Sequence, residues 1–234
     1  EDVHVLAHRK AEFAEHVATP WPDLDTLESV TDRERLFDAA EDASVVVPET
    51  RPLTEWDDWD RDTVIKSRYT VLVENNRASY PSVRYVAGGS PPDVDAVIDE
   101  MGHETIAQEY MPDPSEYAVF ALFDEGEPLA TFQHKQVRAY KYSGGPSAYR
   151  GAVDIPELEG AGIRLLRELD WHGLAMVEFK LDDGVFKLME INPRFWSSLP
   201  FTVQAGVDFP YYYYRLAADG VTDFDAAYEP RTAG

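Results

Sequence analysis

The sequence predicts an α+β protein of two lobes, and three observations indicate this class. Apolar runs typical of strands occur in groups, with only a few amphipathic helical stretches between them. Asp-x-Gly turns at 124–126 and 182–184 join consecutive strands into hairpins, which favours antiparallel pairing. Hydrophobic residues make up 44% of the 234 residues, enough for two small cores. We expect a lobe boundary near residue 111, and we expect residues 1–30 to be a remnant of, or a linker from, an upstream domain.

The first lobe, residues 31–110, is expected to run strand–strand–helix–strand after an opening helix. Thr31 and Glu34 form a capping-box signature, which predicts that the opening helix begins at Thr31. The segment 91–102 predicts a short amphipathic helix, because prolines begin it, a glycine ends it and its apolar residues recur at helical spacing. The other expected elements are strands at 44–50, 63–74, 83–88 and 104–111, a loop at 51–62 and a polar stretch at 75–82.

The second lobe, residues 111–234, is expected to hold a mostly antiparallel sheet with one helix. The helix is predicted over 156–173, where leucines at helical spacing mark one buried side. Two strands joined by a turn are predicted over 116–140, followed by a glycine-bearing loop at 141–151. The last predicted elements are the two strands of a hairpin over 174–192.

The composition excludes several classes of protein. Asp and Glu number 44 against 21 Lys and Arg, a net charge of −23, and such a surface repels nucleic acid and anionic membranes. Without cysteine the chain has neither a disulfide framework nor a thiolate metal site. No apolar run approaches the roughly 20 residues that span a bilayer, and no signal peptide opens the chain. We therefore expect a cytoplasmic protein with small-molecule partners and no nucleic-acid or membrane partner, and its oligomeric state stays open.

Lysine is scarce in this chain, with most of the cations being arginine. An acidic excess with little lysine indicates adaptation to a salt-rich cytoplasm, where screening shortens the range of charge repulsion. An ordinary acidic protein is the alternative. The scarcity also draws attention to Lys66, which lies inside the apolar strand "TVIKS". A strand lysine that merely extends to solvent is the alternative for this residue.

The last predicted hairpin carries polar side chains that a buried strand does not normally hold. Its second strand and the residues after it, "MEINPRFW", have Glu190, Asn192 and Arg194 at alternate positions, and Glu178 lies on the first strand. If the hairpin loop has an odd number of residues, Glu178 and Glu190 share a face of the sheet. With an even loop they face opposite ways. We expect the odd loop and the shared face.

Two carboxylates on one face, about 5–8 Å apart, repel each other unless a cation lies between them. Glu178, Glu190 and Asn192 all offer oxygen, which suits Mg²⁺ held by one or two carboxylates plus substrate phosphates. Arg194 follows the rigid Pro193 and is placed to face a phosphate. The alternative is a surface hairpin with a solvated acidic face, which the apolar residues around these positions disfavour. The pattern therefore predicts a metal–phosphate site.

These residues resemble the magnesium-binding end of the ATP-grasp family of ATP-dependent ligases. The stretch "LMEINPRFWSSLPFTVQAGVDFP" and its lead-in "ELDWHGLAMVEFKLDDG" most resemble the carbamoyl-phosphate-synthase-like, carboxylate–amine ligase branch. The resemblance runs from about Thr31 to about Gly220 and implies an ATP-grasp fold, in which two α+β lobes with antiparallel sheets clamp ATP. The small α/β domain that precedes this fold in the family is not found in the sequence, and residues 1–30 are a candidate for its last element.

The resemblance implies a role for each residue of the metal–phosphate site. Glu178 and Glu190 resemble the magnesium ligands, with Glu190 bridging two ions and Asn192 completing the shell. Arg194 resembles the arginine that faces the γ-phosphate and the acyl-phosphate intermediate. The implied cofactors are ATP and two Mg²⁺ ions, for which Mn²⁺ can substitute.

The resemblance also implies the contacts to the nucleotide. Lys66 matches the lysine that reaches the phosphates from the first lobe, and Arg33 stands where the family commonly has a lysine. Glu116 matches the carboxylate that bonds the ribose hydroxyls, with Ser115 as the alternative. Further cations expected at the phosphates, unless they pair with the acidic surface, are Lys135 and Arg138. The residues expected to line the adenine pocket are Gln108, Glu109, Tyr110 and Met111.

One departure from the family concerns the loop that covers the phosphates, which is often rich in glycine. The corresponding polar stretch here, 75–82, contains no glycine. Asn76, Arg77 and Ser79 are candidates for its role.

The function implied by the resemblance is an ATP-dependent ligase that activates a carboxylate as an acyl phosphate for attack by an amine. Arg150 is a candidate for binding the substrate carboxylate, with an ordinary charged loop residue as the alternative. The alternative function is a nucleotide-binding ATP-grasp module without ligase turnover, either regulatory or truncated. Retention of both glutamates with Asn192 and Arg194 favours the ligase. The identity of the carboxylate and of the amine does not follow from the sequence.

Overall fold

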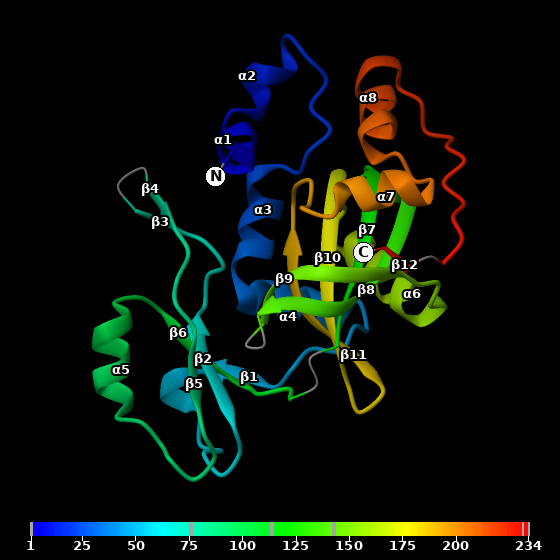
Figure 1. Ribbon diagram of the computed structural model, residues 1–234. Helices are drawn as coiled ribbons and strands as arrows, with labels where there is room; N and C mark the ends of the chain where they lie inside the picture. The colour runs from blue at the N-terminus through cyan, green and yellow to red at the C-terminus, as the bar shows by residue number, and fades with distance from the viewer. Residues whose placement is uncertain (1, 75–76, 113–114, 142–143, 231, 234) are drawn as a thin grey trace.

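Two antiparallel sheets organise the chain, whose computed structural model describes residues 2–74, 77–112, 115–141, 144–230 and 232–233. Figure 1 shows two lobes, a smaller one built on a four-stranded sheet and a larger one built on a six-stranded sheet. A separate hairpin of β3 (Leu72–Glu74) and β4 (Arg77–Ser79) extends from the smaller lobe. This arrangement confirms the predicted α+β class with two antiparallel lobes.

The sheet of the smaller lobe buries one face against α5 (Val94–Met101). Ile65 of the sheet and Val97 of the helix belong to one buried cluster. The Asp93 carboxylate caps the helix by accepting a hydrogen bond from its backbone at 3.1 Å, and Gly102 ends it with a φ of 69°. The predicted helix is therefore confirmed. The strand order is β1 (Thr50–Pro52), β6 (Thr105–Glu109), β2 (Thr63–Ser67) and β5 (Arg84–Val86).

The N-cap of the opening helix is Asp32, one residue after the predicted Thr31. Thr31 ends α3 (Leu24–Thr31), where its hydroxyl donates to a carbonyl of the preceding turn at 3.0 Å. Asp32 is the N-cap of α4 (Arg33–Asp42), and its carboxylate accepts from the backbone N–H of Glu34 at 3.0 Å. The Thr31 hydroxyl is therefore bonded within α3, the helix that ends at this residue, and it does not cap α4.

The strand predicted over 63–74 is divided into β2 and β3. Between them the backbone bonds to the α3–α4 junction, through Arg33 N–H to the Arg68 carbonyl at 2.9 Å and Thr70 N–H to the Thr31 carbonyl at 2.9 Å. These bonds draw the chain out of the sheet after Ser67. Asn76, a candidate for covering the phosphates, lies outside the described residues.

Three other boundaries also differ from the expectation. Only Thr50 of the strand expected at 44–50 is in a strand, and the loop expected at 51–62 contains the rest of β1 and a 3-10 helix, Leu53–Glu55. Most of the loop expected at 141–151 is the strand β9 (Gly144–Ala152), paired with β8 (Glu127–Lys141). Glycine and proline in this segment favour a loop, but pairing with the long neighbouring strand makes it a strand.

The six-stranded sheet of the larger lobe buries both of its faces, in part, under helices. On one face, α3, α4 and α6 (Pro156–Glu168) pack in a cluster that includes Leu36, Leu165 and Val177. On the other face lie α7 (Leu199–Ala205) and α8 (Phe209–Asp219), so the expectation of one helix in this lobe is wrong. The strand order is β11 (Val185–Asn192), β10 (Gly173–Asp182), β7 (Glu116–Asp124), β8 (Glu127–Lys141), β9 and β12 (Thr232–Ala233).

Residues before the expected first lobe also pack on the larger lobe. Leu27 of α3 belongs to the same buried cluster as Leu165, and α1 (Asp2–His8) contacts α3, with α2 (Lys10–Ala14) next to it. The predicted domain limits at residues 30 and 110 stay a prediction. None of the helices in the described part of the chain has the length and apolar composition that a membrane crossing needs.

Candidate functional site

The last hairpin places Glu178 of β10 directly opposite Glu190 of β11. The predicted shared face is therefore confirmed, but the predicted odd loop is wrong. The turn has two residues, Asp183 and Gly184, whose φ angles of 47° and 81° suit a type I′ turn. With a regular ladder beyond such a turn, the two glutamates would lie on opposite faces.

A β-bulge at Met189 restores the shared face. The register shifts by one residue next to the Glu178–Glu190 pair, which makes Met189 the extra residue. Leu188 and Ile191, three positions apart, are both buried in the core under α4 and α6, whereas Met189 and Glu190 both line a cavity. The bulge thus turns two consecutive side chains away from the core.

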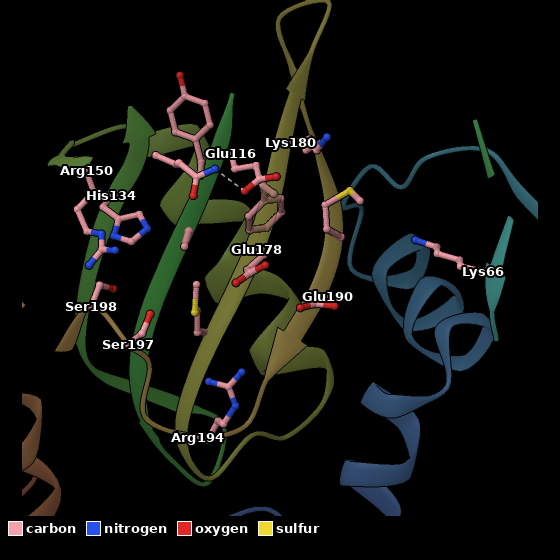
Figure 2. A pocket seen from close by; sticks show the side chains of 16 residues that line it. Lys66, Glu116, His134, Arg150, Glu178, Lys180, Glu190, Arg194, Ser197 and Ser198 are labelled. Carbon is pink, nitrogen blue, oxygen red and sulfur yellow. Dashed lines mark hydrogen bonds between the residues drawn. The ribbon is translucent and has the colours of Figure 1, made fainter. Parts of the chain in front are cut away.

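The cavity between the two lobes has a volume of about 470 Å³. Glu116, Glu178 and Glu190 lie on its larger-lobe wall, and Arg194 lies beside them. Figure 2 shows Lys66 reaching from β2 of the smaller lobe toward this wall. At this cavity the structure therefore brings together two of the three predicted metal ligands, Glu178 and Glu190, with the predicted phosphate arginine and the predicted phosphate lysine.

The three carboxylates of the wall disfavour one another's charge. Burial raises the pKa of Glu178, and the neighbouring Glu190 and Glu116 raise it further, against the opposing effect of Arg194. Burial also raises the pKa of Glu116, whose carboxylate accepts a hydrogen bond from Gln136 at 2.9 Å. A cation at this wall would relieve the repulsion.

Asn192 lies between the carboxylates and Arg194. Its amide nitrogen donates to Glu190 at 3.2 Å, and its amide oxygen accepts from Arg194 at 2.8 Å. Among the described residues, no three His, Cys, Asp or Glu side chains gather at one point that could hold a metal ion. A metal at this wall would therefore be held by two carboxylates and an amide, with the remaining ligands supplied by a bound molecule or water.

Lys66 is 7% exposed, and its ammonium donates to the side-chain oxygen of Gln108 at 2.7 Å. Gln108 in turn donates to the Thr50 hydroxyl at 2.8 Å, which fixes the amide orientation. Burial, and then the nearby charge of Arg33, lowers the pKa of Lys66 to about 7. Lys66 is thus a buried lysine whose ammonium is fixed by Gln108, not one that extends to solvent.

Arg33, at the start of α4, lies close to the same wall. Its guanidinium is 4.0 Å from the Glu190 carboxylate and donates to the Ser67 carbonyl at 2.8 Å. Burial lowers the pKa of Arg33, and Glu190 opposes this shift. Arg33 stands where the family commonly has a lysine, and it likewise places a cation beside Glu190.

The predicted adenine-pocket residues occupy varied environments. Gln108 holds Lys66, as described above, and Met111 is buried. Glu109 forms an ion pair with Lys187 at 2.7 Å, and Tyr110 is 38% exposed. None of the four lines the cavity, so their role at adenine stays a prediction.

The other predicted cations separate into two groups. Lys135 lies over the ring of Tyr117 at 5.1 Å and Arg138 is exposed, and neither lines the cavity. Arg150 of β9 does line it. The roles of Lys135 and Arg138 at phosphates stay predictions.

Several cavity residues were not predicted from the sequence. Lys180 pairs with Glu116 across β10 and β7 on the cavity face, and its two-residue spacing from Glu178 was the signal that could have identified it. Gln136, His134, Ser197 and Ser198 also line the cavity. No local signal distinguishes them from ordinary strand and loop residues.

Solved structures share this fold. The biotin carboxylase domain of the Hydrogenobacter thermophilus 2-oxoglutarate carboxylase, solved with MgADP and bicarbonate, matches with a TM-score of 0.70 and 13% identity, over 97% of this chain and 54% of that one. The Bacillus licheniformis L-amino acid ligase matches with a TM-score of 0.67 and 15% identity, over 94% and 56%. The Campylobacter jejuni biotin carboxylase matches with a TM-score of 0.67 and 12% identity, over 91% and 51%. This chain spans about half the length of these proteins.

A family match covers much of the larger lobe. No curated protein matches the chain. The sequence model of the family described as "ATP-grasp in the biosynthetic pathway with Ter operon" matches residues 102–232, which is more than half of the chain. The predicted resemblance to the ATP-grasp family is confirmed, and the carboxylate–amine ligase branch stays a prediction. The chain belongs to this ATP-grasp family.

Proposed function

We propose that this chain is part or all of an ATP- and Mg²⁺-dependent ligase that activates a carboxylate as an acyl phosphate for attack by an amine. One observation carries the proposal: Glu178 lies directly opposite Glu190 on a cavity wall that faces Lys66 of the other lobe. The solved relatives support it, since one was solved with MgADP and bicarbonate and another is an L-amino acid ligase.

The residues of the wall fit a magnesium site. The atoms with which Glu178, Glu190 and Asn192 can bind a metal are all oxygens, which Mg²⁺ prefers. The pKa of Glu178 is raised by burial and by neighbouring carboxylates, and a bound divalent cation would offset both effects. In our proposal these residues hold two Mg²⁺ ions, for which Mn²⁺ can substitute. When bound, the ions neutralise charge on the phosphoryl oxygens.

The cations around the cavity bind the phosphates in this proposal. Lys66 contacts them from the smaller lobe, Arg33 contacts them from the start of α4, and Arg194 faces the γ-phosphate from the larger lobe. Lys135 and Arg138 are further cations that the chain could bring to the phosphates when a nucleotide is bound. Because Lys66 has a pKa of about 7 in the free protein, a phosphate would also hold its proton.

The nucleoside lies toward β6 in this proposal, which we call the linker strand because the chain passes from it into the larger lobe. The adenine pocket is lined by residues from Gln108 to Met111, and Glu116 bonds the ribose hydroxyls. The accessible carboxylate of Glu116 on the cavity wall supports this role.

The reaction has two steps. A carboxylate oxygen of the substrate attacks the γ-phosphorus, the bond to the ADP oxygen breaks, and an acyl phosphate forms. The neutral amine then attacks the acyl carbon, phosphate leaves, and the amine loses a proton to phosphate or water. The protein positions the reacting groups and stabilises the transferring charge, and it needs no side-chain nucleophile.

A nucleotide-binding module without turnover, regulatory or truncated, is the alternative. The two functions differ in substrate-dependent ADP release. We expect a screen of amino acids and small carboxylates, with Mg²⁺ and high KCl, to find at least one that raises ADP release above background. ATP binding without any such increase would reject the ligase. High KCl is chosen because the charge of −23 fits a cytoplasmic protein of a salt-adapted organism.

A further inference from the structure

A second group of polar side chains lies at the end of the cavity away from Lys66, as Figure 2 shows. The group consists of Arg150 of β9, His134 of β8 and Ser198, which precedes α7. His134 and Ser198 are 5% and 3% exposed. The nucleotide and metal contacts proposed above use none of the three side chains.

The sheet register fixes this group relative to the glutamates. Glu190 pairs with Glu178, Glu178 pairs with Ala118, and Ala118 pairs with His134, so the four residues form one row on one face of the sheet. Neighbouring strands lie about 4.8 Å apart, which places His134 roughly 10 Å from Glu178. The alanine between them lines the cavity and leaves a short apolar floor.

The charges along this row favour an anion at one end only. Glu178 and Glu190 repel an anion at their end of the row unless metal ions are bound. At the other end, burial and then the charge of Arg150 lower the pKa of His134 to about 3, so its imidazole is neutral near pH 7. Burial also lowers the pKa of the Arg150 guanidinium, whose charged form therefore gains from a bound anion.

His134 gives a separate indication of a ligand. Its ring packs against Phe120 with centroids 4.7 Å apart, and its Nδ1 has no hydrogen-bond partner in the part of the chain that the structure describes. Buried polar atoms in folded proteins are normally bonded. A neutral imidazole on the cavity wall can bond a polar ligand without adding charge.

We infer that Arg150, with His134 and Ser198, binds a substrate carboxylate that is not the one phosphorylated. The inference rests on the proposed ligase function. This group lies at the end of the cavity away from Lys66, with His134 roughly 10 Å from Glu178, so a carboxylate held at Arg150 is not the one that attacks a phosphate at the glutamates. It belongs either to an amino acid that acts as the amine or to a dicarboxylic acid that is activated at its other end.

The test compares ligands that differ only in one carboxylate. The probes are L-alanine against L-alaninamide for the amino acid, and succinate against succinamate for the dicarboxylic acid, extended to longer members of each series. Binding to the chain in the presence of MgADP is measured by calorimetry or by ligand-observed NMR. We expect one series to bind at least tenfold more tightly with the carboxylate than with the amide, and the series that does so identifies the source.

Substitution then locates the contact. Arg150→Met should remove the preference for carboxylate over amide, and Arg150→Lys should retain part of it. Ser198→Ala, a smaller change, should weaken carboxylate binding severalfold, and it tests the same contact if Arg150→Met does not fold. Arg167→Met is the matched control, because Arg167 pairs with the exposed Glu127 on the surface.

Each outcome decides the inference. A carboxylate preference that disappears in Arg150→Met but persists in Arg167→Met supports it. No carboxylate preference in either series, or one that Arg150→Met leaves unchanged, overturns it. ADP release is measured separately: Arg150-dependent binding without ADP release would reject the ligase function and leave the carboxylate site in place. ADP release with an Arg150-independent substrate would reject the site and leave the ligase function.

Discussion

The glutamates of the larger-lobe wall and Lys66 of the smaller-lobe wall carry opposite charges, and burial disfavours the charged form of both Glu178 and Lys66. On the larger-lobe wall, Glu178 and Glu190 are fixed opposite each other by the ladder, and burial with like charges raises the pKa of Glu178. On the smaller-lobe wall, Lys66 is buried on Gln108, and burial lowers its pKa to about 7. A ligand that carries both metal ions and phosphates would relieve both walls at once. The comparison indicates a site built for such a ligand and not for an ion pair between the lobes.

The largest effect is expected from removing a carboxylate of the larger-lobe wall. Glu190→Gln or Glu178→Gln should lower substrate-dependent ADP release roughly a hundredfold or more, a loss typical of removing electrostatic stabilisation at a reacting group. Because the substitution also removes a like charge from a crowded wall, Tm without Mg²⁺ should rise. Calorimetry and an ADP assay measure the two effects.

Glu127→Gln, an exposed glutamate that pairs with Arg167, is the control and should change neither quantity. If Glu178→Gln and Glu190→Gln lowered Tm and left ADP release intact, the wall would be a structural acidic cluster.

The next effect concerns the smaller-lobe wall. Lys66→Met should weaken ATP binding by roughly 10- to 100-fold, because a buried charge-assisted contact to phosphate is lost. The pH dependence follows from the lowered pKa. The free lysine loses its proton near pH 7, and bound phosphate favours the protonated form, so ATP affinity should fall as pH rises above 7.

Titration of the ATP Kd between pH 6 and 9 checks this prediction. Lys66→Arg, which stays charged throughout this range, should flatten the dependence. An equally steep curve in Lys66→Arg would assign the pH dependence to another group.

The sequence predicted the larger-lobe wall better than its surroundings, for a physical reason. The apolar periodicity, the prolines and the glycine that mark α5 are local signals. The two-residue spacing that places Glu190 and Asn192 on one face of β11 is also a local signal. The parity argument was right about the face and wrong about the loop, because a two-residue turn and the bulge at Met189 offset each other. The bulge forms because Leu188 and Ile191 both pack in the core, and this packing cannot be read from a short stretch of sequence.

Contacts between distant segments were the least predictable. Glu109 pairs with Lys187, 78 positions along the chain, a contact that the sequence did not indicate. Lys180 and His134 reach the cavity only because the sheet order puts β7 between β10 and β8. Strand order depends on the whole fold, so residues of this kind needed the structure.

A smaller effect is expected from deleting Met189. Without the extra residue, Leu188 and Glu190 become neighbours, and regular alternation still places one in the core and the other in the cavity opposite Glu178. ADP release should therefore fall by no more than about tenfold, as a local change of twist re-aims the carboxylate. Deleting Leu188 is the matched control and should be far more damaging, since it removes a fully buried side chain. Equal losses in both deletions would mean that the bulge itself is required.

The smallest effect is expected at the ion pair that joins the walls outside the cavity. Lys187 of β11 donates to Glu109 of the linker strand at 2.7 Å and pairs with Asp182 at 2.8 Å, with 17% of its side chain exposed. Lys187→Met keeps the aliphatic stem and removes the charge, and Glu109 retains Arg61 at 3.7 Å. We expect the free energy of unfolding to fall by about 1 kcal/mol or less, a Tm decrease of roughly 2–4 °C, with ATP affinity changed only severalfold. A tenfold loss of ATP affinity at unchanged Tm would instead place Lys187 in contact with the nucleotide and bring the linker strand into the site itself.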